Sequence, residues 1–384
     1  MIHKNIKALG WVSFFTDMAS AMITPILPIF IVLILHEDAQ TLGYVLSITT
    51  FVSYGFRFLF GYFSDKYQKT KIFLVIGYGI SAITKPLLSI TSSWQGVSLL
   101  RGTERLGKAV RSASRDKLIS QFSEKNTQGK TFGFHKMMDI AGELTGAFLV
   151  FCILYFFGKN EEVFKNIFTL TIIPGFISVC ILIFFTTDSA QKREKKEFLW
   201  EQSDTQFFPI IGIYLSFLFF IIADSFFLLQ AENSGFPIYF LPLLIMVSTG
   251  TQTLSSLWIG KKIDKLGGDV ILFWSFISGI LGTVSLLFSQ FVFAFIFLGL
   301  YSVASTTALR TLISQQAKNK ASVYGILYAG IAFSTGLGAL FVGYIWTHFG
   351  SDFTIKISLL GCVFSLLIFL VFLEKKQNKE KQES

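Results

Sequence analysis

Charged residues and cysteine are both scarce in this sequence, and each scarcity excludes a class of protein. Only 15% of the 384 residues are charged, against roughly a quarter in soluble domains, so an ordinary water-soluble fold is excluded. The three cysteines, Cys152, Cys180 and Cys362, all lie inside apolar runs. They cannot form a disulfide scaffold between loops, and no Cys/His spacing indicates a zinc site.

Apolar residues dominate instead, at 52% of the chain with 45 phenylalanines. A helix that crosses about 30 Å of hydrocarbon needs roughly 20 largely apolar residues. Runs of this kind predict an all-α integral membrane protein with twelve transmembrane helices, the first of which is not a removable signal. The expected spans are 11–35, 41–63, 72–92, 94–112, 131–157, 167–186, 207–230, 236–259, 270–289, 291–313, 321–346 and 353–373.

A single long hydrophilic loop, 187–206, interrupts the series after the sixth span. The sequence therefore predicts three parts: a six-helix bundle over 1–186, a cytoplasmic linker over 187–206, and a second bundle with a short charged tail over 207–384.

The net charge of +9 is concentrated in short loops between the spans. With the N-terminus in the cytoplasm, 22 of the 33 lysines and arginines fall in the cytoplasmic loops and tails and two in the loops on the other side. Cytoplasmic loops of membrane proteins typically carry such an excess of lysine and arginine. We expect both termini in the cytoplasm, a bacterial inner membrane location, a monomer in the lipid bilayer, and no nucleic-acid partner, since no basic stretch is long enough to form a domain.

The two halves repeat each other. Gly61 and Asp65 follow the second span, and Gly260 and Asp264 follow the eighth, 199 positions later. Glycine-alanine pairs in the fifth and eleventh spans repeat at nearly the same spacing. Because the offset covers an even number of helices, the halves are expected to be parallel repeats. The repeated glycines indicate close helix packing.

The segment Gly61-x-x-x-Asp65-Lys66-x-x-Lys69-x-Lys71 resembles the loop between helices two and three of the major facilitator superfamily, and a weaker copy begins at Gly260. The resemblance implies two six-helix bundles. It also implies that the aspartate bonds across to the other half in one conformation, so Gly61, Asp65, Lys66 and Asp264 are predicted to form a conformational latch.

Other segments of the first half resemble a bacterial branch of that superfamily, which implies no substrate. They are Phe15-Thr16-Asp17, Pro25-x-x-Pro28, Lys85-Pro86-Leu87-Leu88, Arg105-Leu106-Gly107-Lys108-Ala109-Val110-Arg111 and Phe132-Gly133-Phe134-His135-Lys136. Ala21 stands where the branch often has a carboxylate, which removes one possible proton carrier.

Ionisable residues inside the spans are costly and are therefore candidates for function. Arg101, Glu104, Arg105 and Lys108 share one helix face, and His135, Asp139 and Glu143 share another. From a rise of about 1.5 Å per residue, Arg105 and Glu143 lie at similar depths of roughly 16 and 18 Å. These two residues are on consecutive spans, so we expect them to pair at the midplane.

Arg101-x-x-Glu104-x-x-Gly107 also resembles the helix-four motif of the superfamily, whose arginine is linked with proton coupling. Arg105 stands where the family usually has glycine, which favours an anionic group nearby. The alternative is a static lattice of ion pairs joining the fourth and fifth spans.

These features predict a secondary transporter that moves a small organic solute, with an anionic solute as one option, by alternating access, with protons as the coupling ion and export ahead of uptake. No cofactor or bound metal is expected. A carboxylate opposite Arg105 can alternate between pairing with the cation and holding a proton. The residues assigned to substrate and proton coupling are Asp17, Arg101, Glu104, Arg105, Asp139 and Glu143, with Arg57, His135, Lys136 and Asp224 as secondary candidates.

Two alternatives stay open. Uptake of a metal ion, a metal chelate or a siderophore would use His135, Asp139 and Glu143, whose side chains suit a transition metal. A polytopic membrane enzyme would need its catalytic groups at one face, whereas the four histidines are scattered along the chain.

Overall fold

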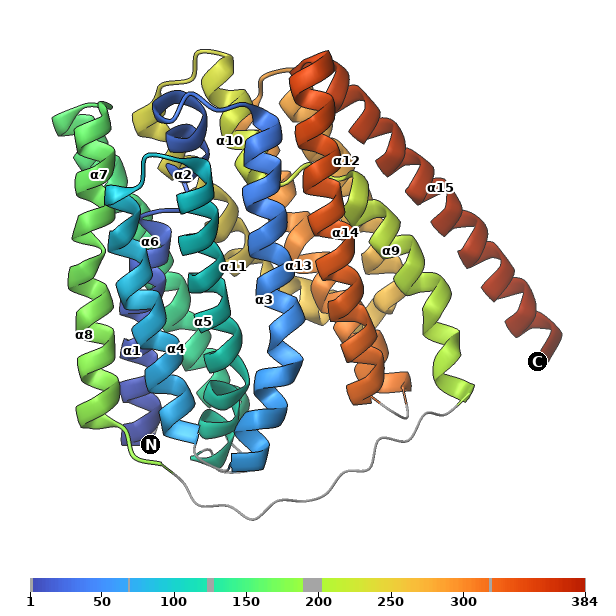
Figure 1. Ribbon diagram of the computed structural model, residues 1–384. Helices are drawn as coiled ribbons and strands as arrows, with labels where there is room; N and C mark the ends of the chain where they lie inside the picture. The colour runs from blue at the N-terminus through green and yellow to red at the C-terminus, as the bar shows by residue number, and fades with distance from the viewer. Residues whose placement is uncertain (1–2, 68–69, 123–127, 189–201, 318–319, 384) are drawn as a thin grey trace. The chain divides into compact units, whose positions relative to one another are not determined.

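The computed structural model describes residues 3–67, 70–122, 128–188, 202–317 and 320–383 (Figure 1). Across these residues the chain is helical and has no strand, which confirms the predicted all-α class. It divides into two compact units, 1–195 with 235–246 and 196–234 with 247–384. Most of the predicted linker, 189–201, falls outside the described residues.

The first unit contains five long helices. These are α1 (Lys4–Ala21), α3 (Ala39–Tyr67), α4 (Thr70–Leu87), α5 (Trp94–Gln121) and α6 (Gln128–Phe157). Its shorter elements are α2 (Leu27–Ile29), η1 (Phe30–Ile34), η2 (Leu88–Ile90), α7 (Glu161–Leu170) and α8 (Ile172–Phe185).

The second unit is built in a similar way. Its helices are α9 (Phe208–Phe220), α10 (Asp224–Asn233), α12 (Gly268–Leu287), α13 (Phe291–Gln316), α14 (Lys320–Phe349) and α15 (Ser351–Glu383). The short η3 (Gln202–Phe207) precedes α9. The helix α11 (Leu241–Leu266) belongs to this unit from 247 onward, whereas its first residues and the preceding η4 (Ile238–Phe240) group with the first unit.

Nine helical stretches among the described residues are long and apolar enough to cross a membrane. They match the third span and the fifth to twelfth spans expected from the sequence. The first, second and fourth expected spans are also helical, but they fall outside that criterion. For α5 the reason is its charged residues, from Arg101 to Arg111. The count of twelve membrane helices therefore stays a prediction.

Two spans that the sequence predicts as continuous helices are interrupted. Residues 22–26 separate α1 from α2, and residues 221–223 separate α9 from α10. In the first case Pro25 removes a backbone N–H that a continuous helix would need. In the second, Ile221 is extended with ψ 131° and the Asp224 carboxylate accepts a hydrogen bond from the Ser225 N–H at 2.8 Å. The breaks begin 199 positions apart, the spacing at which Gly61 and Gly260 repeat.

Close packing at glycine joins the fifth span to the first within the first unit. A Cβ placed on Gly142 would meet the Phe14 carbonyl oxygen, and one on Gly146 would meet the Met18 carbonyl oxygen. The second unit repeats this arrangement, since a Cβ on Gly338 of α14 would meet the Phe219 carbonyl oxygen of α9. The repeated glycines therefore allow two helix backbones to approach closely in each unit.

A second close crossing lies between α4 and α5. A Cβ on Gly77 would lie 2.6 Å from the Gly107 carbonyl oxygen, and a Cβ on Gly107 would lie 2.7 Å from that of Gly77. This crossing brings the polar face of α5 against α4.

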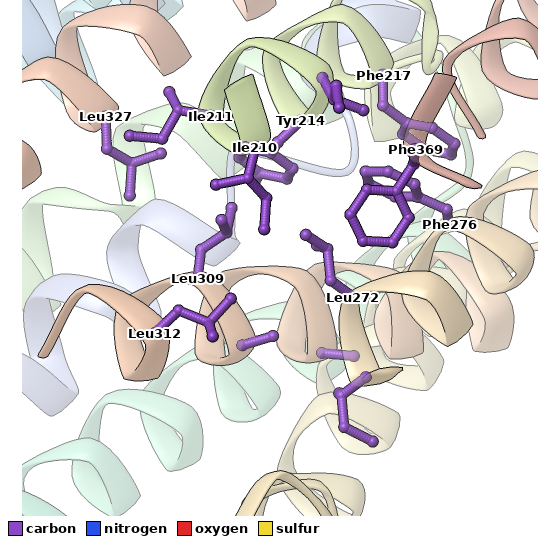
Figure 2. Packing of buried hydrophobic residues seen from close by; sticks show 14 of the residues in the cluster. Ile210, Ile211, Tyr214, Phe217, Leu272, Phe276, Leu309, Leu312, Leu327 and Phe369 are labelled. Atoms are coloured by element: carbon purple, nitrogen blue, oxygen red, sulfur yellow. The ribbon is translucent and has the colours of Figure 1, made fainter. Parts of the chain in front are cut away.

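The core of the second unit is aromatic and aliphatic (Figure 2). The Phe217 and Phe276 rings stack with centroids 4.3 Å apart, and Phe369 meets Phe276 edge-on at 5.3 Å. Leu272, Leu309 and Ile211 extend the cluster, so α9, α12, α13 and α15 share one apolar interior.

The Gly142 contact can be tested with Gly142→Ala. The added methyl group would press on the α1 backbone, which cannot move like a flexible side chain. We expect a loss of about 1–3 kcal/mol of stability, measured as a lower melting temperature in detergent. Gly133→Ala on the same helix is the matched control, because nothing lies within 4 Å of its added Cβ. Equal effects of the two substitutions would contradict the packing role.

Candidate functional site

The ionisable side chains of the first unit gather on α1, α4, α5 and α6. Among the described side chains of these helices the buried or partly buried lysines and arginines are Lys71, Lys85, Arg101, Arg105, Lys108, Arg111 and Arg115, and the carboxylates are Asp17, Glu104, Asp139 and Glu143. Several come from helices far apart in sequence, and the tight α1–α6 and α4–α5 packing brings them into one region of this unit.

Glu104 is the anionic centre of α5. Arg101 Nη1 contacts Glu104 Oε2 at 2.5 Å, one helical turn apart, and both side chains are almost fully buried. Arg105 Nε lies 4.0 Å from the same oxygen and is 24% exposed. One carboxylate thus faces two guanidinium groups, and Arg105 keeps part of its surface open.

Lys85 is the most deeply buried cation, at 1% exposure. Its Nζ donates to the Thr16 carbonyl oxygen of α1 at 3.0 Å. The same carbonyl oxygen also accepts a hydrogen bond from the Ser20 hydroxyl at 3.1 Å. Of the described carboxylates, none lies within ion-pair distance, 4.0 Å, of Lys85.

Arg111 is held by α4 through polar and aromatic contacts. Its Nη1 donates to Ser81 Oγ at 2.5 Å and to Gly77 O at 3.4 Å. The guanidinium lies 4.5 Å from the centroid of the Tyr78 ring. A cation over an aromatic face is stabilised by the ring quadrupole, so Arg111 is fixed without a carboxylate.

Asp17 connects the α5 charges to those of α6. It acts electrostatically on Lys85, on Lys108 and on Glu143. The expected pairing of Arg105 with Glu143 is not found: among the described residues Glu143 is influenced by Asp17, Lys136, Lys108 and Asp139. The physical reason is that α6 packs along α1 and barely touches α5, so the charge that acts most strongly on Glu143 is that of Asp17 on the first span.

His135 forms a buried chain with two neighbours. His135 Nε2 hydrogen-bonds with Ser13 Oγ of α1 at 2.9 Å, and His135 Nδ1 lies 3.3 Å from Asp139 Oδ1. All three residues are buried. Lys136, the next residue along α6, is exposed and does not join them.

The predicted latch lies largely beyond what the structure describes. Gly61, Asp65 and Lys66 are on the final turns of α3, but their side chains, like that of Arg57, fall outside the described residues. Asp264 of the second copy is exposed near the end of α11. The latch therefore stays a prediction.

The second unit has a pocket of about 210 Å³ at the break between α9 and α10. Asp224, the secondary candidate, is exposed at its edge and is the one ionisable carboxylate in the lining. The other polar groups of the lining are uncharged: Ser248, Gln252, Tyr301, Ser302 and Thr335. The lining of this pocket therefore carries one charged group, and its other polar groups are hydroxyls and an amide.

In the described residues no group of three or more histidine, cysteine, aspartate or glutamate side chains is arranged to hold a metal ion. Glu143 does not complete a set with His135 and Asp139. The structure therefore gives no support to a metal site there.

Sequence reasoning did not assign roles to Ser13, Tyr78, Lys85 or Arg111. A signal existed for Lys85, a cation in an apolar span beside Pro86, and for Arg111, which lies on the face of Arg101 and Glu104 in helical projection. The contacts of Ser13 and Tyr78 depend on which helices pack together, which the sequence does not state.

Comparison with known proteins gives the family. A model of the Major Facilitator Superfamily matches residues 9–326. The chain belongs to the major facilitator superfamily. It is an integral membrane protein of a family of transporters, and the alternative of a membrane enzyme is set aside.

An uncharacterised transporter of the same superfamily from Methanocaldococcus jannaschii is 30% identical to this chain over 363 residues. The match covers 90% of this chain and 89% of that protein. The crystal structure of the nucleoside transporter NupG has a TM-score of 0.79 at 15% identity, covering 97% and 99% of the two chains. That of a D-xylose–proton symporter has a TM-score of 0.67 at 15% identity, with 95% of each chain covered. The two structural matches show the major facilitator fold and nothing about the substrate.

The Arg101–Glu104 pair gives a prediction that separates a static lattice from a functional site. Glu104→Gln leaves a buried arginine without its main partner, which costs about 3–5 kcal/mol and should lower the melting temperature strongly. Glu161→Gln is the control, because its pair with Lys165 is exposed and is worth less than about 1 kcal/mol.

The double variant Arg101→Leu/Glu104→Leu should recover much of the lost stability, since apolar residues can replace a buried ion pair. If the pair serves transport, the recovered protein should still fail to transport. A double variant that is both stable and fully active would show that the pair is structural only.

Proposed function

We propose that this chain is a proton-coupled secondary transporter of a small organic anion. In this proposal both chain termini lie in the cytoplasm of a bacterial cell, and transport proceeds by alternating access. The cation-rich cluster of the first unit receives the anionic group of the solute. In the second unit, the pocket at the α9–α10 break offers hydroxyl and amide groups and the Asp224 carboxylate.

The observation that carries this proposal is the imbalance of charge on α4 and α5. Lys85, Lys108 and Arg111 have no described carboxylate within 4.0 Å, and Glu104 is shared by two arginines. Buried cations normally have anionic partners, because an unpaired charge in a low dielectric is expensive. A solute carboxylate or phosphate beside Arg105 and Lys108, which are partly exposed, would supply the missing negative charge.

Proton coupling is proposed for Glu143, with Asp17 and Asp139 as further carriers. Glu143 is partly exposed and is influenced by like charges, Asp17 and Asp139, and by opposite charges, Lys136 and Lys108. The proton occupancy of a carboxylate in such a place changes when either neighbour moves. The D-xylose–proton symporter has the same fold, so the architecture is compatible with this coupling.

Export and uptake use the same geometry, and transport assays distinguish them. Proteoliposomes with an imposed pH gradient should accumulate small organic acids from a labelled panel in preference to their neutral amides. Collapse of the gradient with a protonophore should abolish accumulation, and the gradient direction that supports it gives symport or antiport.

Within this assay Glu143→Gln should abolish gradient-driven accumulation and leave solute exchange within about twofold of the unmodified protein, because the neutral side chain keeps its shape and loses its titration. Glu162→Gln, on the exposed start of α7, is the control and should change neither. Accumulation that survives in Glu143→Gln eliminates this carrier. Parallel loss of exchange, accumulation and melting temperature would instead assign Glu143 to stability.

A further inference from the structure

A groove of about 290 Å³ opens on the second unit where α11 meets α12. Trp258 and Lys262 of α11 form one wall, and Ile271 and Trp274 of α12 form the other. Leu300 and Ala304 of α13 lie behind them. None of these residues belongs to the pocket at the α9–α10 break, so the groove is separate from the proposed solute site.

The groove has an apolar floor and an aromatic rim. Ile259, Ile271 and Ala304 are buried at its base, whereas the Trp258 and Trp274 side chains are 60% and 59% exposed. Two exposed indoles on neighbouring helices are a large apolar surface for a monomeric protein to leave uncovered. In a membrane protein such a surface meets the lipid.

A cation is placed at the open end of this groove. Lys262 Nζ lies 5.5 Å from the centroid of the Trp258 ring. Lys261 and Lys265 are exposed on the same turns. Of the nearby acids, Asp264 is exposed between them, and Asp269 is paired with Lys376 at 2.5 Å. The rim is therefore positive around an apolar cleft.

The depths of these residues match the layers of a bilayer. The connection at Gly267 marks the end of both helices. At a rise of about 1.5 Å per residue from Gly267, Lys262 lies roughly 7 Å and Trp258 roughly 13 Å back along α11. Trp274 lies roughly 10 Å forward along α12. Lysine at the outer level can reach the headgroups, and tryptophan favours the boundary between headgroups and acyl chains.

We propose that this groove binds an anionic phospholipid, with an acyl chain between Trp258 and Trp274 and the phosphate at Lys262. The positive rim selects an anionic headgroup over a zwitterionic one. The binding depends on the membrane environment of the chain and not on the transported solute, so it stands apart from the proposed function.

Native mass spectrometry of the purified full chain with phosphatidylglycerol and phosphatidylcholine, at equal concentrations and matched acyl chains, tests this directly. The unmodified protein should retain phosphatidylglycerol preferentially. Lys262→Gln should reduce that binding about fivefold, the effect of one lysine near an anionic surface, and leave phosphatidylcholine unchanged. Lys261→Gln, which removes the same charge one residue away from the groove lining, should have little effect.

Fluorescence locates the lipid. Brominated phosphatidylglycerol should quench tryptophan emission more than brominated phosphatidylcholine, and the difference should disappear in Trp258→Phe/Trp274→Phe, which keeps apolar rings in place. Equal losses in Lys261→Gln and Lys262→Gln would show diffuse attraction and overturn the site. Equal quenching by the two lipids would also overturn the site. A dimer that dissociates in Trp274→Phe would overturn it too, because a second copy of the chain would then occupy the groove.

Discussion

A charge inside a hydrocarbon layer must find a partner within the protein, and the first unit is organised around that requirement. The partners differ for each cation. Arg101 takes the carboxylate of Glu104, Lys85 takes the carbonyl oxygen of Thr16, and Arg111 takes a serine hydroxyl and a tyrosine ring. The Arg101–Glu104 pair lies within one helix, whereas Lys85 and Arg111 reach their partners across helix contacts, from α4 to α1 and from α5 to α4. The glycines at the α4–α5 crossing allow the close approach that the Arg111 contacts need.

The two units share a packing plan and differ in chemistry. Gly142 and Gly338 allow the same close approach of paired helices, and both units interrupt their first span at corresponding positions. Interrupted helices in matching places of two repeats are a common mark of a transport site, because the freed backbone groups and the bend line a cavity. On this shared frame the first unit carries cations and carboxylates, and the second carries hydroxyl and amide groups around one aspartate.

The sequence predicted what depends on local spacing. The two bundles, the all-helical class and the contact of Arg101 with Glu104 follow from hydrophobic length, repetition and an i, i+3 interval. It did not predict which helices pack together, because pairs of spans with similar apolar faces look alike. The assumption that consecutive spans are neighbours placed Arg105 opposite Glu143, whereas α6 lies along α1 and the charge that acts most strongly on Glu143 is that of Asp17. The bond from Lys85 to a backbone oxygen was also hidden, since a carbonyl carries no residue-type signal.

The central claim, that the cations of the first unit bind an anion, is tested most directly by ligand-induced stabilisation of the purified protein. Each small organic acid of a panel would be compared with its neutral amide by the shift in melting temperature, in unmodified protein and in Arg105→Gln. A bound acid at a hundred times its dissociation constant should stabilise the folded state by about 2.7 kcal/mol. The account predicts that at least one acid raises the melting temperature, that its amide does not, and that Arg105→Gln remains folded but loses the effect. Equal stabilisation by acid and amide, or an undiminished shift in Arg105→Gln, would contradict it.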